Sequence, residues 1–195
     1  MHKKQDLSLF KMPKGFRGKP GWYVQIWWLV QSTLFRLSPQ FAYSYRAMLL
    51  RLFGAKVGKK TVIRPTAKIT YPWKVEIQDN VWIGDDVVLY SLGSIKIGSN
   101  SVISQRSYIC AGDHDYSDPS FPIRGIGISI GEECWLATDT FVAPGVTIAK
   151  GVVTGARSSV FTNLPENMVC LGSPCKPIKI RKVKDGWSPA LNAPR

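Results

Sequence analysis

Aliphatic residues spaced by six positions constrain the fold more than any other feature of this sequence. A period of six fits neither an α-helix nor a strand of simple alternation. It predicts short strands joined by corners, in which three such units close one triangular coil and successive coils stack their aliphatic side chains into a continuous core. With two short shifts and one long insert, the repeat contains Val57, Ile63, Ile69, Ile77, Ile83, Leu89, Ile97, Ile103, Ile109, Ile130, Leu136, Val142, Ile148, Thr154 and Val160.

The repeated units also resemble those of a known family. The segments IGDDVV, IGSNSV, IGEECW, VAPGVT and TGARSS are similar to the units of the hexapeptide-repeat transferases. This resemblance implies an all-β, left-handed parallel β-helix over residues 55–175, against the usual right-handed preference of parallel connections. It also implies a homotrimer with active sites between the subunits.

One histidine lies in the long insert of the repeat. The sequence contains only His2 and His114, and His114 falls in the break at residues 111–129, where Pro119 and Pro122 indicate a projecting loop. An imidazole can remove a proton near neutral pH from a hydroxyl or amine that attacks a thioester. Asp113, Asp115, Asp118 or a backbone carbonyl could orient the ring, and the sequence leaves these alternatives open.

The family resemblance gives this histidine a role. In hexapeptide acetyltransferases a loop histidine at this place is the general base, and the stretch ICAGDHDYSDP resembles that loop, so His114 is the expected catalytic residue. The β-helix carbonic anhydrases, in contrast, bind zinc through three histidines. One loop histidine cannot supply three ligands, so no metal is expected.

The later repeats resemble the coenzyme A side of sugar and xenobiotic acetyltransferases. The resemblance implies acetyl-CoA as the acyl donor. It places Thr138 and Trp135 near the thioester and Ala156 beside the pantetheine arm. It further places Phe161 and Thr162 at the adenine end, and Lys176 and Lys179 at phosphates, where the family often has arginines.

The whole chain resembles the acetyltransferases of colanic acid biosynthesis. That resemblance implies O-acetylation of a sugar or saccharide intermediate during exopolysaccharide assembly. Two alternatives stay open: an acetyltransferase of the same fold acting on an amine or an amino acid such as serine, and a non-catalytic β-helix scaffold. The stretch around Tyr90, Ser91 and Leu92 departs from the family, so the acceptor pocket is unassigned.

Charge is concentrated at the two ends of the chain. Residues 1–60 hold 12 Lys and Arg against Asp6 alone, and residues 176–195 hold six against Asp185. We therefore divide the chain into a basic arm and N-terminal helical region at 1–54, the β-helix at 55–175, and a basic tail at 176–195. The basic ends attract phosphate. The chain lacks a recognisable recognition helix or base-stacking module, so nucleic acid is not an expected partner.

The N-terminal region contains an aromatic stretch, PGWYVQIWWLVQSTLF, without any charged residue. Ser38 and Pro39 then predict the cap and first position of a helix that Gly54 would end. The stretch either packs on the open end of the coil or makes a peripheral contact with an anionic membrane, and the two can coexist. Four cysteines without C-x-x-C spacing predict small buried side chains and a cytoplasmic protein.

Overall fold

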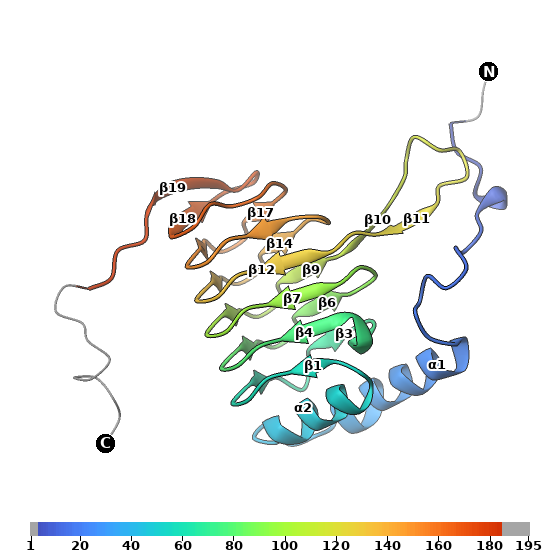
Figure 1. The fold of residues 1–195 in the computed structure, drawn as a ribbon, viewed down its shortest axis with the longest axis horizontal. Helices are drawn as coiled ribbons and strands as arrows, with labels where there is room; N and C mark the ends of the chain where they lie inside the picture. Colours follow the sequence, from blue (N-terminus) through green and yellow to red (C-terminus); the bar gives the residue numbers. More distant parts are fainter. Residues whose placement is uncertain (1–3, 185–195) are drawn as a thin grey trace.

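The chain winds into a stack of triangular coils that stands on two N-terminal helices (Figure 1). The computed structural model describes residues 4–184. His2 and the outer ends of the predicted basic arm and basic tail lie outside the described residues. Each complete coil contributes one short strand to each of three sheets, which we call A, B and C. This arrangement confirms the predicted parallel β-helix.

The strands follow the order A, B, C along the chain. Sheet A contains β1 (Lys56–Val57), β4 (Val75–Ile77), β7 (Ile95–Ile97), β12 (Ile128–Ile130) and β15 (Thr147–Ile148). Sheet B contains β2 (Val62–Ile63), β5 (Trp82–Ile83), β8 (Val102–Ile103), β13 (Trp135–Leu136), β16 (Val153–Thr154), β18 (Met168–Leu171) and β19 (Lys176–Ile180). Sheet C contains β3 (Lys68–Ile69), β6 (Val88–Tyr90), β9 (Tyr108–Cys110), β14 (Phe141–Val142) and β17 (Ser159–Val160).

The six-residue repeat forms the core as predicted. Its aliphatic residues pair with their own equivalents in the neighbouring coil, as in Ile83 with Ile103 and Leu89 with Ile109. All of the repeat positions except Val57 are buried. Thr154, the one polar member, lies in the interior with its hydroxyl 3.0 Å from that of Thr140. The interior is therefore a continuous apolar column.

Small residues at the corners let the coils approach one another. A Cβ on Gly98 would lie 2.5 Å from the backbone nitrogen of Glu132 in the next coil. Real Cβ atoms do not come that close to backbone, so this corner needs glycine. The stacking distance between coils thus explains why a small residue follows so many of the core aliphatics.

Residues 20–54 form a cap that closes the first coil. The cap contains α1 (Gly21–Val30), a π-helical turn (Gln31–Phe35) and α2 (Tyr43–Leu52). The apolar side chains on its inner side belong to the same core cluster as the coil residues; they are Trp27, Phe35, Leu49, Leu50 and Phe53. The predicted packing of this segment on the coil is confirmed.

Cap side chains also satisfy the exposed backbone edge of the first coil. The Trp27 indole donates to the Ile69 carbonyl at 2.8 Å, and the Ile69 amide donates to the Gln31 side chain at 2.6 Å. The Arg46 guanidinium donates to the Ile63 carbonyl at 2.6 Å. Because β2 and β3 are the end strands of their sheets, these bonds replace the missing next coil.

The start of the second helix differs from the prediction. The helix α2 begins at Tyr43 rather than at Pro39, and Ser38 does not cap it. The Ser38 hydroxyl instead donates to the Phe35 carbonyl and accepts a bond from Arg46. A tertiary contact with a buried arginine has replaced the local capping bond that the sequence suggested.

The segment before the cap runs along the outside of the coil toward the hairpin of β10 and β11 (Figure 1). The Trp73 indole donates to the Arg17 carbonyl, and the Lys74 ammonium donates to the Phe16 carbonyl. Farther along, the Asp6 amide donates to the Pro119 carbonyl at 2.7 Å. The arm therefore connects the cap to the tip of the projecting loop.

The cysteine side chains form no disulfide among the described residues. All four cysteines are free; Cys134, Cys170 and Cys175 are buried and Cys110 is half-buried, in agreement with their predicted role as small interior side chains. Within residues 4–184, no helix combines the length and the apolar content needed to cross a bilayer.

Candidate active site

His114 lies on a β-hairpin that projects from the coil. The hairpin is formed by β10 (Gly112–His114) and β11 (Ile123–Gly125), which pair antiparallel with His114 opposite Ile123. It leaves the coil after β9 of sheet C and returns before β12 of sheet A. We call the corner between these sheets the C–A edge. The long insert therefore presents its histidine outside the stack of coils, as predicted.

A backbone carbonyl orients the imidazole. The His114 Nδ1 lies 2.9 Å from the Phe121 carbonyl oxygen, and the Phe121 ring stacks on the imidazole at 4.2 Å between centroids. A carbonyl can only accept, so Nδ1 carries a proton, and in the neutral imidazole the lone pair is then on Nε2. This is the tautomer that a general base requires. Phe10 of the arm adds a second aromatic contact, at 6.2 Å between centroids.

The three nearby carboxylates are engaged elsewhere. Asp113 forms a bidentate pair with Arg124 at 2.9 and 2.8 Å. Asp115 and Asp118 each accept bonds from a serine two residues later in the loop. Hydrogen bonding to Ser117 lowers the pKa of Asp115, which keeps the Asp115 carboxylate ionised. Of the alternatives for orienting His114, the geometry selects the backbone carbonyl.

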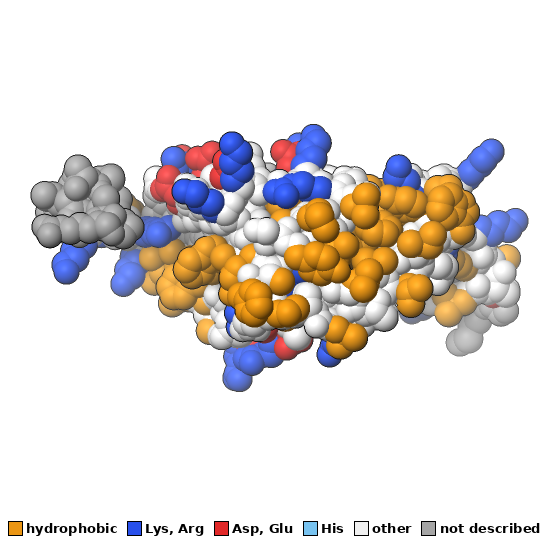
Figure 2. Space-filling model, turned by 90° about the horizontal axis from the view of Figure 1, so that it is seen from below, with side chains coloured by type: hydrophobic (Ala, Val, Ile, Leu, Met, Phe, Trp, Pro, Cys, Tyr) orange, Lys and Arg blue, Asp and Glu red, His pale blue; other side chains and the backbone are white. Residues whose placement is uncertain are grey.

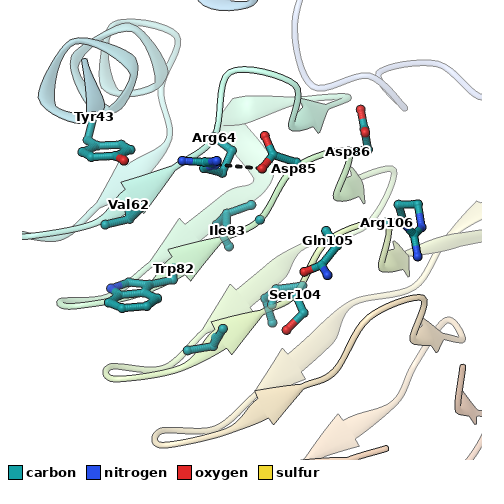
Figure 3. Close-up of a pocket in the computed structure, with 13 residues that line it drawn as sticks. Tyr43, Val62, Arg64, Trp82, Ile83, Asp85, Asp86, Ser104, Gln105 and Arg106 are labelled. Atoms are coloured by element: carbon teal, nitrogen blue, oxygen red, sulfur yellow. Dashed lines mark hydrogen bonds and ion pairs between the residues drawn. The ribbon is translucent and has the colours of Figure 1, made fainter. Parts of the chain in front are cut away.

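A groove of about 720 Å³ runs along sheet B (Figure 3), whereas the hairpin leaves the coil between sheets C and A. The groove lies between the outward side chains of β5 and β8, beneath Tyr43 of the cap. Its charged wall is the pair between Arg64 and Asp85, at 2.8 Å. Hydrogen bonding to Asp85 raises the pKa of Arg64. The Trp82 side chain, 57% exposed, offers an open aromatic face.

Two of the predicted coenzyme A residues, Trp135 and Thr138, adjoin this groove. The Trp135 indole donates to the Ser104 hydroxyl at 2.9 Å, and the Thr138 hydroxyl donates to the Gln105 carbonyl at 3.1 Å. Ser104 and Gln105 both line the groove. Ala156 follows at the corner of the next coil, where it is exposed. We call this corner between sheets B and C, with the groove beside it, the B–C edge.

The B–C edge is also held by ion pairs. Arg106 forms a bidentate bond with Asp139, at 2.8 and 2.9 Å. This pairing lowers the pKa of Asp139, so its carboxylate stays ionised. Arg157 lies farther from the same carboxylate, at 3.8 Å. Arg106 and Arg157 thus flank the Asp139 carboxylate next to Thr138, and Asp86 adds a second carboxylate near Arg106.

The remaining predicted residues lie in other places. Phe161 and Thr162 follow β17 and belong to the C–A edge, the same edge as the hairpin; both are exposed, and the Phe161 ring lies 5.9 Å from that of Phe141. Lys176 and Lys179 are exposed on β19, the last strand of sheet B. The predicted residues of one chain are thus divided among the B–C edge, the C–A edge and the last strand of sheet B.

Sequence reasoning missed the groove residues. Trp82 occupies the same repeat position as Trp135, directly before a core aliphatic, and its outward placement was readable from that register. The pairing of Arg64 with Asp85 was not readable, because these residues belong to different coils. Among the described residues, no group of three or more His, Cys, Asp and Glu side chains is arranged to hold a metal ion.

Comparisons with known proteins agree with this geometry. No protein-family model matches the chain. The chain is 61% identical over 177 residues to an Escherichia coli K12 protein with the provisional name colanic acid biosynthesis acetyltransferase WcaF, a match that covers 91% of this chain and 97% of that protein. A maltose O-acetyltransferase from Clostridium difficile 630 has a TM-score of 0.77 at 23% identity, covering 94% of this chain and 99% of that one. A galactoside acetyltransferase in complex with coenzyme A has a TM-score of 0.70 at 20% identity, covering 93% and 92%.

The stack of short parallel strands is a β-helix fold that the chain shares with these solved acetyltransferases. The identity to WcaF over nearly its whole length shows that the chain belongs to the hexapeptide-repeat acetyltransferases. The solved structures, at lower identity, confirm the left-handed β-helix with an N-terminal helical extension.

Proposed function

We propose that this acetyltransferase moves the acetyl group of acetyl-CoA to a hydroxyl of a sugar or saccharide intermediate in exopolysaccharide biosynthesis. The name of the 61% identical relative supports the pathway, and the maltose and galactoside enzymes support a sugar acceptor. The coenzyme A complex of the latter supports the donor. The observation that carries the proposal is the His114 imidazole, held through Nδ1 with Nε2 free.

The reaction needs one base and no covalent enzyme intermediate. Nε2 of His114 takes the proton of the acceptor hydroxyl as its oxygen bonds to the thioester carbonyl carbon. The Thr138 backbone amide stabilises the tetrahedral intermediate, because the amides of Ala137, Asp139 and Thr140 already donate to groups within the coil. Its collapse breaks the carbon–sulfur bond, and the proton on Nε2 passes to the departing coenzyme A thiolate. The products are the acetyl ester and coenzyme A, and His114 returns to its starting tautomer.

The substrates occupy the groove and the B–C edge. Trp82 stacks on the apolar face of the sugar ring, and the ion pair of Arg64 with Asp85 binds its hydroxyls. Trp135, Thr138 and Ala156 line the thioester and pantetheine part of the donor.

The ends of the donor bind at residues beyond the groove. Phe161 and Thr162 contact the adenine, while Lys176 and Lys179 bind the phosphates. Because Phe161 and Thr162 lie on the C–A edge with His114, one donor contacts residues from two chains.

We further propose a homotrimer that acts in the cytoplasm, where acetyl-CoA is made. His114 emerges between sheets C and A, whereas the groove opens on sheet B of the same chain. A base on one edge of the coil serves a groove on another edge only when two copies lie side by side. Closed cyclic symmetry with three such contacts gives three equivalent sites.

The replacement H114A tests the catalytic role. Loss of a general base lowers turnover by about 10²- to 10⁴-fold, while acetyl-CoA affinity should change little because the proposed donor contacts are made by other residues, Trp135, Thr138 and Ala156 among them. The matched control is Y116F in the same loop, whose ring is exposed. Thiol release in the presence of an acceptor panel gives the rate, and calorimetry gives the affinity.

The same measurements separate the alternatives. Turnover of H114A close to that of the wild type would place the base elsewhere. Faster acetylation of serine or an amino sugar than of sugar hydroxyls would replace the proposed acceptor. Failure of the wild type to bind acetyl-CoA would favour the scaffold role.

A further inference from the structure

We propose that the outer side of the cap is a docking surface for an anionic lipid bilayer. This inference goes beyond the proposed function, because it says where the enzyme acts rather than what it catalyses. The cap face is defined by the large apolar side chains that the cap exposes; they are Trp22, Ile26, Trp28, Leu29, Leu34, Leu37, Phe41, Met48 and Leu52. Figure 2 shows hydrophobic side chains spread across this end of the molecule.

The two sides of α1 have separate roles. Val24 and Trp27 are fully buried against the coil. Trp22, Ile26 and Leu29 follow one another at helical spacing on the opposite side, and Leu29 is 64% exposed. Core packing thus explains the inward residues and leaves the outward ones unexplained. A soluble protein seldom exposes a continuous apolar surface of this size unless something binds there.

The second helix repeats the pattern. Leu49 and Leu50 of α2 are buried, whereas Met48 and Leu52 point outward and are more than half exposed. Phe41, in the turn before α2, and Leu37 are each 79% exposed. The cap lies across the end of the coil (Figure 1), and hydrophobic side chains are spread over that side of the molecule (Figure 2).

The charges around the cap face suit anionic lipid. No Asp or Glu occurs between Pro20 and Gly54. Arg36 is exposed in the cap, and Lys19, Lys56 and Lys59 are exposed in the adjoining segments. Figure 2 shows Lys and Arg side chains bordering the apolar surface, with Asp and Glu beside some of them, and Lys56 is paired with Glu76 of the coil. Basic residues at the edge of an inserted apolar surface add to membrane affinity through the negative potential of the leaflet.

The cap face also contains an apolar hollow of about 400 Å³. It lies between the end of the π-helical turn and α2, and most of its lining is apolar, from Leu34, Leu37, Pro39, Ala42 and Tyr45. Leu34 and Leu37 are both exposed, so the hollow opens outward. Such a hollow can receive part of a lipid acyl chain when the surrounding side chains enter the interface.

A bilayer is a better occupant than a second copy of the chain. Two cap faces placed against each other would bring their basic borders together without any acidic residue of the cap to offset them. A bilayer meets both the apolar surface and the positive border. In the proposed trimer, where the coils lie side by side, the three caps face one membrane and their affinities combine.

Vesicle co-sedimentation tests the proposal with three proteins. The test variant is L29Q/L34Q/L37Q, which changes exposed residues only. The matched control is I180Q/V183Q, in which two exposed apolar residues change at the opposite end of the coil. The vesicles contain phosphatidylcholine alone or phosphatidylcholine mixed with phosphatidylglycerol, at low and high salt.

The expected results are specific to the cap. The wild type and the control bind the mixed vesicles, and high salt weakens this binding. The cap variant binds at least tenfold more weakly, while it melts at the wild-type temperature and keeps wild-type turnover with a soluble acceptor. Turnover with soluble acceptor depends on the proposed chemistry alone, so the two ideas can fail separately.

Four results would overturn the proposal. They are absence of wild-type binding to mixed vesicles, wild-type binding by the cap variant, equal binding of the wild type to both vesicle types, and a cap-dependent increase in oligomer size without vesicles. The last result would assign the cap face to a second copy of the chain.

Discussion

Arg46 provides a quantitative test of how the cap closes the coil. Its side chain is fully buried, and among residues 4–184 no carboxylate lies within ion-pair distance of it. Its four hydrogen bonds, between 2.6 and 2.8 Å, instead go to the Ile63, Pro39 and Gln40 carbonyls and to the Ser38 hydroxyl. Burial lowers the pKa of Arg46.

The replacement R46M isolates these bonds, because methionine keeps much of the apolar stem. The Ile63 carbonyl then stays buried without a partner, at a cost of about 1–3 kcal/mol. The other acceptors lie nearer solvent and each lose about 0.5–1 kcal/mol. Removal of a buried charge returns part of this loss. We expect R46M to lower the free energy of unfolding by about 2–4 kcal/mol.

Urea unfolding followed by tryptophan fluorescence measures the change, since Trp27 lies in the same cap. The control is R36M, which alters an exposed arginine and should stay within about 0.5 kcal/mol of the wild type. R46K replaces the planar guanidinium with a single ammonium, so its free energy of unfolding should lie between those of R46M and R36M. If R46M were as stable as the wild type, the hydrogen bonds from Arg46 to the backbone of the first coil and of the cap would not contribute to stability, which would refute this reasoning.

Two further predictions concern the coil. G98A should cost about 1–3 kcal/mol, because the added Cβ meets the backbone of Glu132 at 2.5 Å. G21A should be harmless, because a Cβ there would lie 3.7 Å from the end of the Arg17 side chain. Urea unfolding compares the two variants, and equal midpoints would contradict the close stacking of the coils. Burial raises the pKa of the Cys170 thiol to about 11, so folding favours the protonated form and the stability it contributes is lost as pH rises from about 9 through 11. C170A should therefore lose less of its free energy of unfolding than the wild type does as the pH rises over this range. An equal loss in the two proteins would assign the pH dependence to other groups.

The repeat made the coil predictable from the sequence. The residue at the position of Ile83 or of Leu89 points inward in each coil. The six-residue period therefore predicts which strand such a residue belongs to and which residues of the adjacent coils it pairs with. The cap was predictable only in outline. Ser38 carries a local helix-capping signal, but the buried Arg46 takes its hydroxyl, and a contact between distant residues leaves no local signature.

The contact that orients His114 could not be predicted from the sequence either. Three aspartates stand near it in the sequence, yet each is satisfied by another partner, and the Phe121 carbonyl holds the ring. Every residue has a carbonyl, so the sequence could not indicate which one. The groove beside Trp82 was hidden for a related reason, since its walls come from successive coils and from the cap.

The central claim is that the His114 of one protomer acts at the groove of its neighbour. Mixed oligomers of H114A and R64A/W82A, formed by co-expression in equal amounts, test it most directly. If the base and the groove come from different chains, random assembly restores about a quarter of the wild-type sites, although each variant alone has little activity. If both come from one chain, no mixed oligomer contains an intact site, and activity that stays at the level of the separate variants would contradict the account.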